Sequence, residues 1–388
     1  MNVITDTDEL ARACKMLGAQ PFATVDTEFL RENTFWPQLC LIQMAGPEGE
    51  FIVDPLSDKL NLAPFFELMA NEATTKVFHA GRQDLEIIHA LTRKEGAGII
   101  PKPLFDTQVA AMVCGFGESI GYVNLVKRIL GHELDKGARF TDWSRRPLSP
   151  KQLTYALADV THLRDVYTYL ANELEATKRT SWVAEEMATL SAPETYAADP
   201  DLAWRRLKMR VKNRRALAVM MELAAWRDRQ AQSQDVPRSR ILRDEALYDI
   251  ANQSPTDPSK LGQLRTLSDG FARSARAKEI VAVVKAGLDR DMATVPKLNT
   301  GNALTPEATA ISDLLRVLLK ACAARHRVAT KLIADSSDLD RIASEDEPDV
   351  IALKGWRREL FGEEALRVKR GEVAVTVIDG EITTVPRG

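Results

Sequence analysis

The chain has 388 residues, of which 45% are hydrophobic and 28% are charged, and its formal net charge is −3. A chain of this length has more residues than one hydrophobic core ordinarily organises, so we expect a soluble globular protein of two or three domains. The near-neutral charge excludes a chain that is basic throughout, so any contact with nucleic acid must come from local basic patches.

Four cysteines lie far apart in the sequence and form no metal-ligand spacing. We expect reduced, buried thiols and a cytoplasmic protein. Residues 1–10 are acidic and lack the apolar segment of a signal peptide. The sequence holds no apolar run long enough to span a bilayer, so no membrane contact is expected.

Strand and helix signals alternate over the first 190 residues. Asp6 and Glu9 have the spacing of a capping box at the start of a helix. The later patterns predict strands at 22–29, 39–44, 50–54 and 76–80, a hairpin turn at 46–49 and a helix at 62–70. This order predicts a mixed sheet with helices on its faces.

Two acids, Asp26 and Glu28, lie in the strand predicted at 22–29. Alternate strand residues share a face, so these carboxylates should lie roughly 7 Å apart. Like charges at this distance repel unless a cation lies between them, and Mg²⁺ and Mn²⁺ prefer carboxylate oxygens. Such a pair is also common on solvated strand faces, so further carboxylates are needed to indicate a metal site.

A third acid, Asp84, follows the Gly81 break and precedes the helical spacing of Leu85, Ile88 and Leu91. This pattern places Asp84 in the first turn of a helix, where the helix dipole favours an anion. We therefore expect its carboxylate to stay ionised and available. An ordinary first-turn aspartate is the alternative interpretation.

A fourth acid, Asp159, lies on a helix with a clear start. The start is indicated by Ser149 at the N-cap, Pro150 at the first helical position and Gln152 at the third, where it can complete a capping box. Tyr155 and Asp159 are four residues apart and should share one helical face. A half-buried core tyrosine and a solvated aspartate are the alternatives.

The second half of the chain has two predicted breaks and mainly helical patterns. Residues 191–200 resemble a linker, and a second break falls at 295–302. The segments between and after these breaks are almost wholly helical, with similar length and texture, which suggests a distant repeat. The residues from 373 to 385 are rich in β-branched side chains and predict either a small hairpin or a loose tail.

The sequences at 25–29, 79–84 and 155–159 resemble the three exonuclease motifs of the DEDD superfamily, tyrosine subclass. The stretches at 105–108, 134–136 and 142–148 narrow the resemblance to the ribonuclease D family. It implies an α/β ribonuclease H-like exonuclease domain at 1–190, followed by all-α helical HRDC-like domains. These would be an HRDC domain at 203–290, a divergent second HRDC-like domain at 305–365 and a tail at 366–388.

The resemblance implies that Asp26, Glu28, Asp84 and Asp159 are catalytic and hold two divalent cations, Mg²⁺ or Mn²⁺. It gives Tyr155 the task of orienting the attacking water, since a phenol is a poor base at neutral pH. Tentative contacts with the terminal nucleotide are Thr27, Phe29 and His79. Core packing is the alternative for Phe29 and His79, and His162 is expected to be structural.

Basic residues gather in two places. The run 204–215 holds seven basic residues and no acid, and we expect Arg205, Arg206 and Arg210 to contact RNA phosphates. Arg145 and Arg146, in the loop before the Tyr155 helix, are a second candidate. The alternative is a helix surface paired with acids elsewhere.

The resemblance implies a monomeric 3′→5′ exoribonuclease that releases nucleoside 5′-monophosphates. Its expected substrates are tRNA precursors and other structured RNA with 3′ tails. Two alternatives stay open. One is a DNA 3′→5′ exonuclease, because the sequence has no decisive marker for the 2′-hydroxyl group. The other is a non-catalytic RNA-binding scaffold, which the complete set of acids disfavours.

Overall fold

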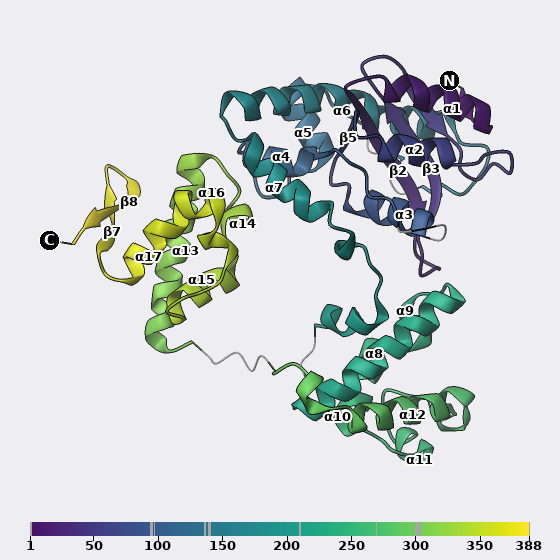
Figure 1. The fold of residues 1–388 in the computed structure, drawn as a ribbon, viewed down its shortest axis with the longest axis vertical. Helices are drawn as coiled ribbons and strands as arrows, with labels where there is room; N and C mark the ends of the chain where they lie inside the picture. Colours follow the sequence, from purple (N-terminus) through teal and green to yellow (C-terminus); the bar gives the residue numbers. More distant parts are fainter. Residues whose placement is uncertain are drawn as a thin grey trace. The chain divides into compact units, whose positions relative to one another are not determined.

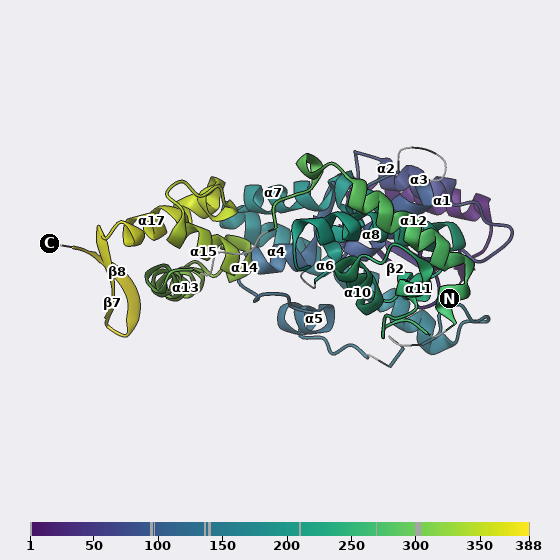
Figure 2. The ribbon, with the colours of Figure 1, turned by 90° about the horizontal axis from the view of Figure 1, so that it is seen from below.

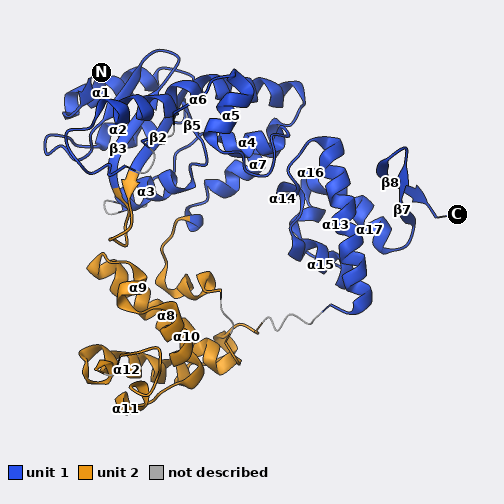
Figure 3. Cartoon of the chain, turned by 180° about the vertical axis from the view of Figure 1, so that it is seen from behind, with its two compact units in different colours: residues 1–28, 39–195, 301–388 blue, residues 29–38, 196–300 orange. Residues whose placement is uncertain are grey.

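The computed structural model describes residues 2–93, 96, 98–135, 137–138, 141–208, 211–268, 270–298 and 304–387. The chain forms two compact units (Figure 3). The first unit contains residues 1–28, 39–195 and 301–388, and the second contains residues 29–38 and 196–300. A bilayer-spanning helix is absent from the described part of the chain.

The first unit is built on a six-stranded sheet with the strand order β1-β4-β3-β2-β5-β6 (Figure 1). The strands are β1 (Val3–Ile4), β2 (Phe22–Leu30), β3 (Gln38–Ala45), β4 (Glu50–Val53), β5 (Thr75–Phe78) and β6 (Leu104–Asp106). β3 and β4 run antiparallel, whereas β1 with β4, β2 with β5 and β5 with β6 are parallel pairs. The predicted mixed sheet is confirmed, and the short strands β1 and β6 extend it at both edges.

Among the described residues of the first unit, seven helices precede the linker. They are α1 (Thr7–Gly18), α2 (Ala63–Ala70), α3 (Arg82–Arg93), α4 (Thr107–Val113), α5 (Tyr122–Leu130), α6 (Pro150–Ala176) and α7 (Thr180–Leu190). Helix α6 packs against β4 and β5, and α4 and α7 pack against β6. The residues of β3 from Leu39 to Ala45 are all buried, because helices cover both faces of the sheet at this interior strand.

The second unit is helical apart from the segment 29–38. Its helices are α8 (Arg214–Gln234), α9 (Arg238–Ile241), α10 (Asp244–Gln253), α11 (Pro258–Leu261) and α12 (Ala275–Asp289), with the 3₁₀ turns η2 (Pro200–Arg206), η3 (Phe271–Arg273) and η4 (Met292–Thr294). Helix α8 packs against α10, α12 and η2. The fully buried side chains of Leu223, Leu247 and Ile280 lie in the core between these helices.

The last helices belong to the first unit. They are α13 (Pro306–His326), α14 (Thr330–Ile333), α15 (Ser336–Ser344), α16 (Gly355–Arg357) and α17 (Glu363–Lys369), with η5 (Ile351–Leu353) and the π-helical turn η6 (Arg358–Gly362). Trp356 stacks on Trp182 of α7 with ring centroids 4.4 Å apart. The buried Arg357 side chain contacts Glu185 at 2.9 Å and also Glu186.

The chain ends in an antiparallel hairpin of β7 (Val373–Ile378) and β8 (Glu381–Pro386), which follows α17 (Figure 2). This resolves the choice that the sequence left open in favour of the hairpin. The predicted linker at 191–200 contains the 3₁₀ turn η1 (Pro193–Thr195) and passes from the first unit to the second. Residues 299–302 of the second predicted break lie outside the described residues.

Candidate active site

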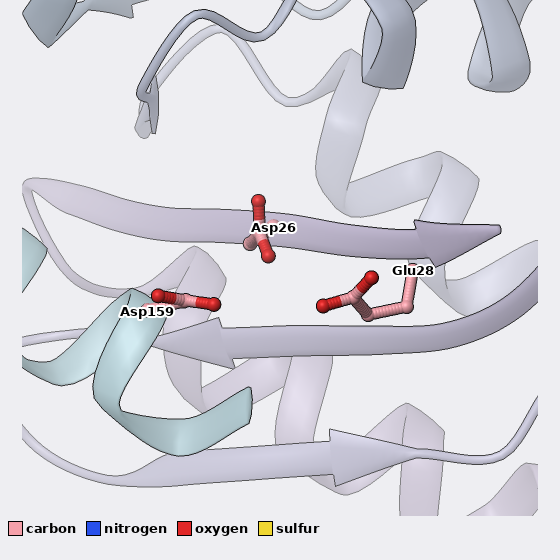
Figure 4. A group of neighbouring side chains, drawn as sticks. All are labelled: Asp26, Glu28 and Asp159. Carbon is pink, nitrogen blue, oxygen red and sulfur yellow. The ribbon is translucent and has the colours of Figure 1, made fainter. Parts of the chain in front are cut away.

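Three carboxylates of the first unit gather beside strand β2. Asp26 and Glu28 come from β2 and Asp159 comes from α6, and the side chain of Glu28 points back toward Asp159 (Figure 4). One oxygen of each acid lies within 4.8 Å of the others, and all three residues are half-buried. Residues more than 130 positions apart in the sequence thus form one acidic cluster.

Hydrogen bonds to the carbonyls on both sides of Asp159 hold α6 in place. Thr24 of β2 donates to the carbonyl of Val160 at 2.9 Å, and the hydroxyl of Tyr122 donates to the carbonyl of Ala158 at 2.8 Å. The helix begins at the predicted capping box, in which Ser149 accepts from the amide of Gln152. The register of Asp159 against Asp26 is therefore fixed at the site itself.

The fourth acid, Asp84, lies in the first turn of α3, as predicted, and is buried. The turn before α3 is unusual, because Ala80 has a φ of 55°, in the left-handed region that alanine rarely adopts. The carboxylate of Asp106 accepts from the amides of Ala80 and Gly81 at 3.1 and 2.9 Å. These bonds hold the strained turn and thereby orient the start of α3.

The side chain of Thr27 connects the strand acids to Asp84. Thr27 lies between Asp26 and Glu28 in the sequence but points to the opposite face, where it is buried and donates its hydroxyl to Asp84 Oδ1. The tentative contact of Thr27 with a nucleotide stays a prediction, and its hydroxyl is already engaged within the protein.

Burial dominates the electrostatics of the acids. It raises the pKa of Asp26 well above its usual value, and the neighbouring Asp84, Asp159 and Glu28 raise this pKa further. Burial also raises the pKa of Asp84 to about 7, although the hydrogen bond from Thr27 opposes that rise. The effect of burial opposes the expectation that the helix dipole keeps Asp84 ionised, and that expectation stays a prediction.

Tyr155 lies one turn before Asp159 on α6 and shares a hydrogen bond with it. Burial and the charges of Asp159, Glu28 and Asp26 raise the pKa of the phenol far above its ordinary value. The ring lies beside the buried Trp143, with centroids 6.1 Å apart. Tyr155 is thus a neutral hydroxyl, held at the edge of the acidic cluster, that can donate a hydrogen bond but not act as a base at neutral pH.

Two other tentative nucleotide contacts occupy different surroundings. The Nδ1 atom of His79 lies 3.0 Å from the hydroxyl of Thr107, its ring leans against Tyr122, and burial lowers its pKa. Phe29 is half-buried on β2, one residue after Glu28. His162 forms a ring pair with His132, at 5.2 Å between centroids, and the structural role expected for it stays a prediction.

The two arginines of the loop before α6 differ sharply. Arg145 is 84% exposed and pairs with Asp142 at 3.1 Å. Arg146 binds both carboxylate oxygens of Asp54 and the carbonyls of Cys40, Trp143 and Arg145, so each of its nitrogens is engaged. Arg146 thus joins the loop before α6 to Asp54, and its contact with RNA stays a prediction.

The described part of the basic run at 204–215 is divided between two elements. η2 ends at Arg206 and α8 begins only at Arg214, after Asn213, which caps it. Arg214 and Arg215 donate to backbone carbonyls at and after the end of α12, so neither is a free cation. Arg205 and Arg206 are exposed, with Arg206 3.8 Å from Asp228, whereas Arg210 lies outside the described residues.

Two residues of this site escaped the sequence analysis. Tyr122 lies close enough to Asp159, Asp26 and Tyr155 for all three to raise the pKa of its hydroxyl, after the larger effect of burial. Thr24 anchors α6 from the strand that carries Asp26. Nothing in the local pattern around either residue signals the site, because both act through tertiary contacts with α6.

Comparison with known proteins agrees with this geometry. A sequence model described as 3′-5′ exonuclease matches residues 1–175, and a model described as HRDC domain matches residues 216–284. The fold and the acidic cluster thus define a protein of the 3′-5′ exonuclease class that carries an HRDC domain.

Full-length relatives narrow this class. The chain is 52% identical to ribonuclease D of Nitrobacter hamburgensis over 387 residues, covering 100% of both chains. It is 50% identical to ribonuclease D of Jannaschia sp., covering 96% of each. The crystal structure of Escherichia coli RNase D, described as an exoribonuclease involved in structured RNA processing, superposes with a TM-score of 0.80 at 29% identity, covering 96% of this chain and 99% of that one. The chain belongs to the ribonuclease D family.

Proposed function

We propose that the chain is a divalent-cation-dependent 3′→5′ exoribonuclease that removes nucleoside 5′-monophosphates from RNA 3′ ends, with a role in tRNA 3′ maturation. The observation that carries this proposal is the convergence of Asp26, Glu28 and Asp159 within 4.8 Å in a chain of the ribonuclease D family. We propose Asp84 as the fourth member, because Thr27 donates a hydrogen bond to it and its charge raises the pKa of Asp26.

The donor set suits hard divalent cations. All four acids offer oxygen ligands, which Mg²⁺ and Mn²⁺ prefer, and the charges of Asp84, Asp159 and Glu28 add to burial in raising the pKa of Asp26. We propose that these four residues hold two such ions. When bound, the ions supply Lewis-acid stabilisation of the phosphate and of the attacking and leaving oxygens.

Each residue then has a defined task. The four acids would hold the cations when these are bound. Tyr155, neutral and bonded to Asp159, presents its hydroxyl to the attacking water and orients it. Tyr122 and Thr24 hold the backbone on each side of Asp159, so the carboxylate keeps its position during turnover.

The remaining contacts with RNA are proposed from exposure and charge. Arg205 and Arg206 are exposed in the last turn of η2 on the second unit, and Arg145 is exposed before α6. They can contact phosphates without reading sequence, which fits a preference for single-stranded tails. We propose Phe29 and His79 as the side chains nearest the terminal nucleotide, because they flank the acidic motifs.

We propose the domain limits 1–190, 203–290, 305–365 and 366–388. The lengths of the helices support a divergent repeat of the HRDC domain. α8 and α13 each have 21 residues. Each is capped by a residue in the left-handed conformation, Asp235 after α8 and Arg327 after α13, and each is followed by a helix of 4 residues. α10 and α15 then have 10 and 9 residues.

We further propose that the protein acts as a monomer in the cytoplasm. All four acids come from one chain, so the site needs no second copy. The four cysteines are free and buried, which fits a reducing compartment.

Matched substrates test this proposal. The purified protein would be given 5′-end-labelled duplexes with identical single-stranded 3′ overhangs of RNA or DNA, and the released products would be identified. We expect 5′-monophosphates and faster shortening of the RNA overhang. Faster shortening of DNA would favour the DNA exonuclease, and bound but intact RNA would favour a non-catalytic scaffold.

A further inference from the structure

The second unit contains a hollow of about 700 Å³ that the active site does not use. Five arginines line it: Arg31, Arg206, Arg227, Arg238 and Arg243. Two acids, Asp244 and Glu245, also line it, and the fully buried Asp228 lies behind Arg206 and Arg238. Positive charge therefore exceeds negative charge even when Asp228 is included.

One of these arginines is buried with part of its bonding capacity unused. The side chain of Arg227 is 5% exposed and binds Asp244 at 2.6 Å and the carbonyl of Leu242 at 3.0 Å. Its Nε–H has no hydrogen-bond partner among the described residues. A buried guanidinium with an unpaired donor is costly unless an anion supplies more negative charge nearby.

Two further arginines differ in how firmly they are held. Arg238 binds both oxygens of Asp228, and its guanidinium lies 4.5 Å from the ring centroid of Phe35. Arg243 is exposed at the start of α10 and has no side-chain partner in the part of the chain that the structure describes. A fixed cation beside an available one is a suitable arrangement for an oxyanion, because the planar guanidinium binds phosphate in a bidentate manner.

The hollow is directly connected to the strand of the active site through the chain. Phe35 and Trp36 belong to the segment that follows β2, and their amides both donate to Asp235 at 3.0 Å, so this segment is part of the second unit. Arg31 follows Glu28 by three residues, and three residues span at most about 11 Å. A few nucleotides of single strand cover such a distance.

We propose that this hollow binds a backbone phosphate of the RNA strand a few nucleotides upstream of the 3′ end. The proposal rests on the proposed function and adds a specific subsite to it. The subsite keeps a tail engaged while its terminal nucleotides are removed. An acidic protein segment is the competing ligand chemistry, and the test below separates the two.

The test uses RNA tails in which one phosphate at a time is neutral. Each tail carries a single methylphosphonate linkage on a 2′-O-methyl nucleotide, with the 2′-O-methyl tail as its reference. Binding would be measured with Mg²⁺ in an Asp26→Ala background, which prevents cleavage. Arg243→Gln would be compared with Arg265→Gln, an exposed arginine of the same unit that does not line the hollow.

In the protein with Arg243 intact, we expect a methylphosphonate at one upstream linkage to lower the affinity for the RNA tail. Arg243→Gln should bind every tail more weakly, and a methylphosphonate at that same linkage should not lower its affinity further. The slope of log affinity against log salt should fall by about 0.7 for one lost contact with a single strand. Arg265→Gln should bind like the protein with both arginines.

Three results would overturn the subsite: equal losses for Arg243→Gln and Arg265→Gln, unchanged sensitivity of Arg243→Gln at that linkage, or stronger competition by polyglutamate than by the RNA tail. Hydrolysis of a dinucleotide, too short to reach the hollow, by the protein with Asp26 intact separates this failure from that of the proposed function. A protein that cleaves the dinucleotide without a linkage-specific effect of Arg243 is an exonuclease lacking the subsite. A protein that cleaves neither the dinucleotide nor the RNA overhang described above is not an exonuclease.

Discussion

Thr27 donates its hydroxyl hydrogen to Asp84, so a residue between the two acids of β2 holds the acid of α3. The strand therefore presents Asp26 and Glu28 on one face and supports Asp84 from the other. The hydrogen bond lowers the pKa of Asp84 against the larger effect of burial, which raises it to about 7. Thr27 thus helps to keep the fourth carboxylate ionised.

Thr27→Val tests this support with an isosteric side chain. We expect weaker binding of Mg²⁺ or Mn²⁺ by about 10- to 100-fold, because groups that orient a ligand carboxylate have effects of this size. Isothermal titration of the cation would measure it.

Thr168→Val is the matched control, since Thr168 is exposed on α6 and bonds only the carbonyl of Arg164 among the described residues. Unchanged cation affinity in Thr27→Val would show that the hydrogen bond does not support Asp84.

The raised pKa of Asp84 predicts a pH-dependent effect of the cation on stability. The usual pKa is 3.8 and the folded value is about 7, so between these values the unfolded chain is ionised and the folded one keeps its proton. In the metal-free protein, the contribution of Asp84 to the free energy of unfolding therefore falls as the pH rises through this interval, and it is constant at higher pH. A bound cation requires the ionised form.

The stabilisation that excess Mg²⁺ gives over EDTA should therefore grow from about pH 4 to about pH 7 and then level off. Chemical denaturation at several pH values would measure the free energy of unfolding in each condition. Asp84→Asn should lose part of this pH dependence, because the raised pKa of Asp26 supplies the rest. A difference that is flat with pH in the unaltered protein would contradict the raised pKa values.

Tyr155→Phe should lower turnover by roughly 10- to 100-fold and leave cation affinity unchanged, because the hydroxyl orients water but is not a ligand. The raised pKa of Tyr155 adds a second expectation, namely that ionisation of this phenol causes no loss of activity up to about pH 10. Pre-steady-state cleavage across a pH series would measure both effects. Tyr169→Phe, an exposed tyrosine on the same helix, is the control, and equal turnover in both variants would remove the role of Tyr155.

Tyr122→Phe should cost about 1 kcal/mol of stability through the lost hydrogen bond to Ala158. We also expect a several-fold fall in kcat with little change in KM, because Asp159 is positioned less firmly while the RNA contacts stay intact. Denaturation and steady-state cleavage would be measured on the same preparation. A fall in stability alone, with kcat preserved, would make Tyr122 purely structural.

Local patterns were sufficient to predict much of the catalytic unit. The period of two in β2 places Asp26 and Glu28 on one face, and the capping box at Ser149 sets the turn of α6 on which Tyr155 and Asp159 lie. These features depend on near neighbours in the sequence, so they can be read without the fold.

Features that depend on tertiary contacts could not be predicted. Burial raises the pKa of Asp84, and burial is known only once α3 is packed. The sequence around Arg146 predicts an exposed cation, but its guanidinium pairs with Asp54, which lies 92 residues earlier. Asn213 starts α8 within the basic run, and Arg214 and Arg215 donate to backbone carbonyls that lie 78 and 73 residues later.

The central claim is that the converging acids hold cations that cleave RNA from its 3′ end. The most direct measurement follows a 5′-end-labelled RNA with a single-stranded 3′ tail in Mg²⁺, Mn²⁺ or EDTA, for the unaltered protein and for Asp159→Asn. We predict a ladder that shortens by one nucleotide at a time with either cation and is absent in EDTA and in Asp159→Asn. Shortening that persists in Asp159→Asn, or RNA that stays intact with both cations, would contradict the account.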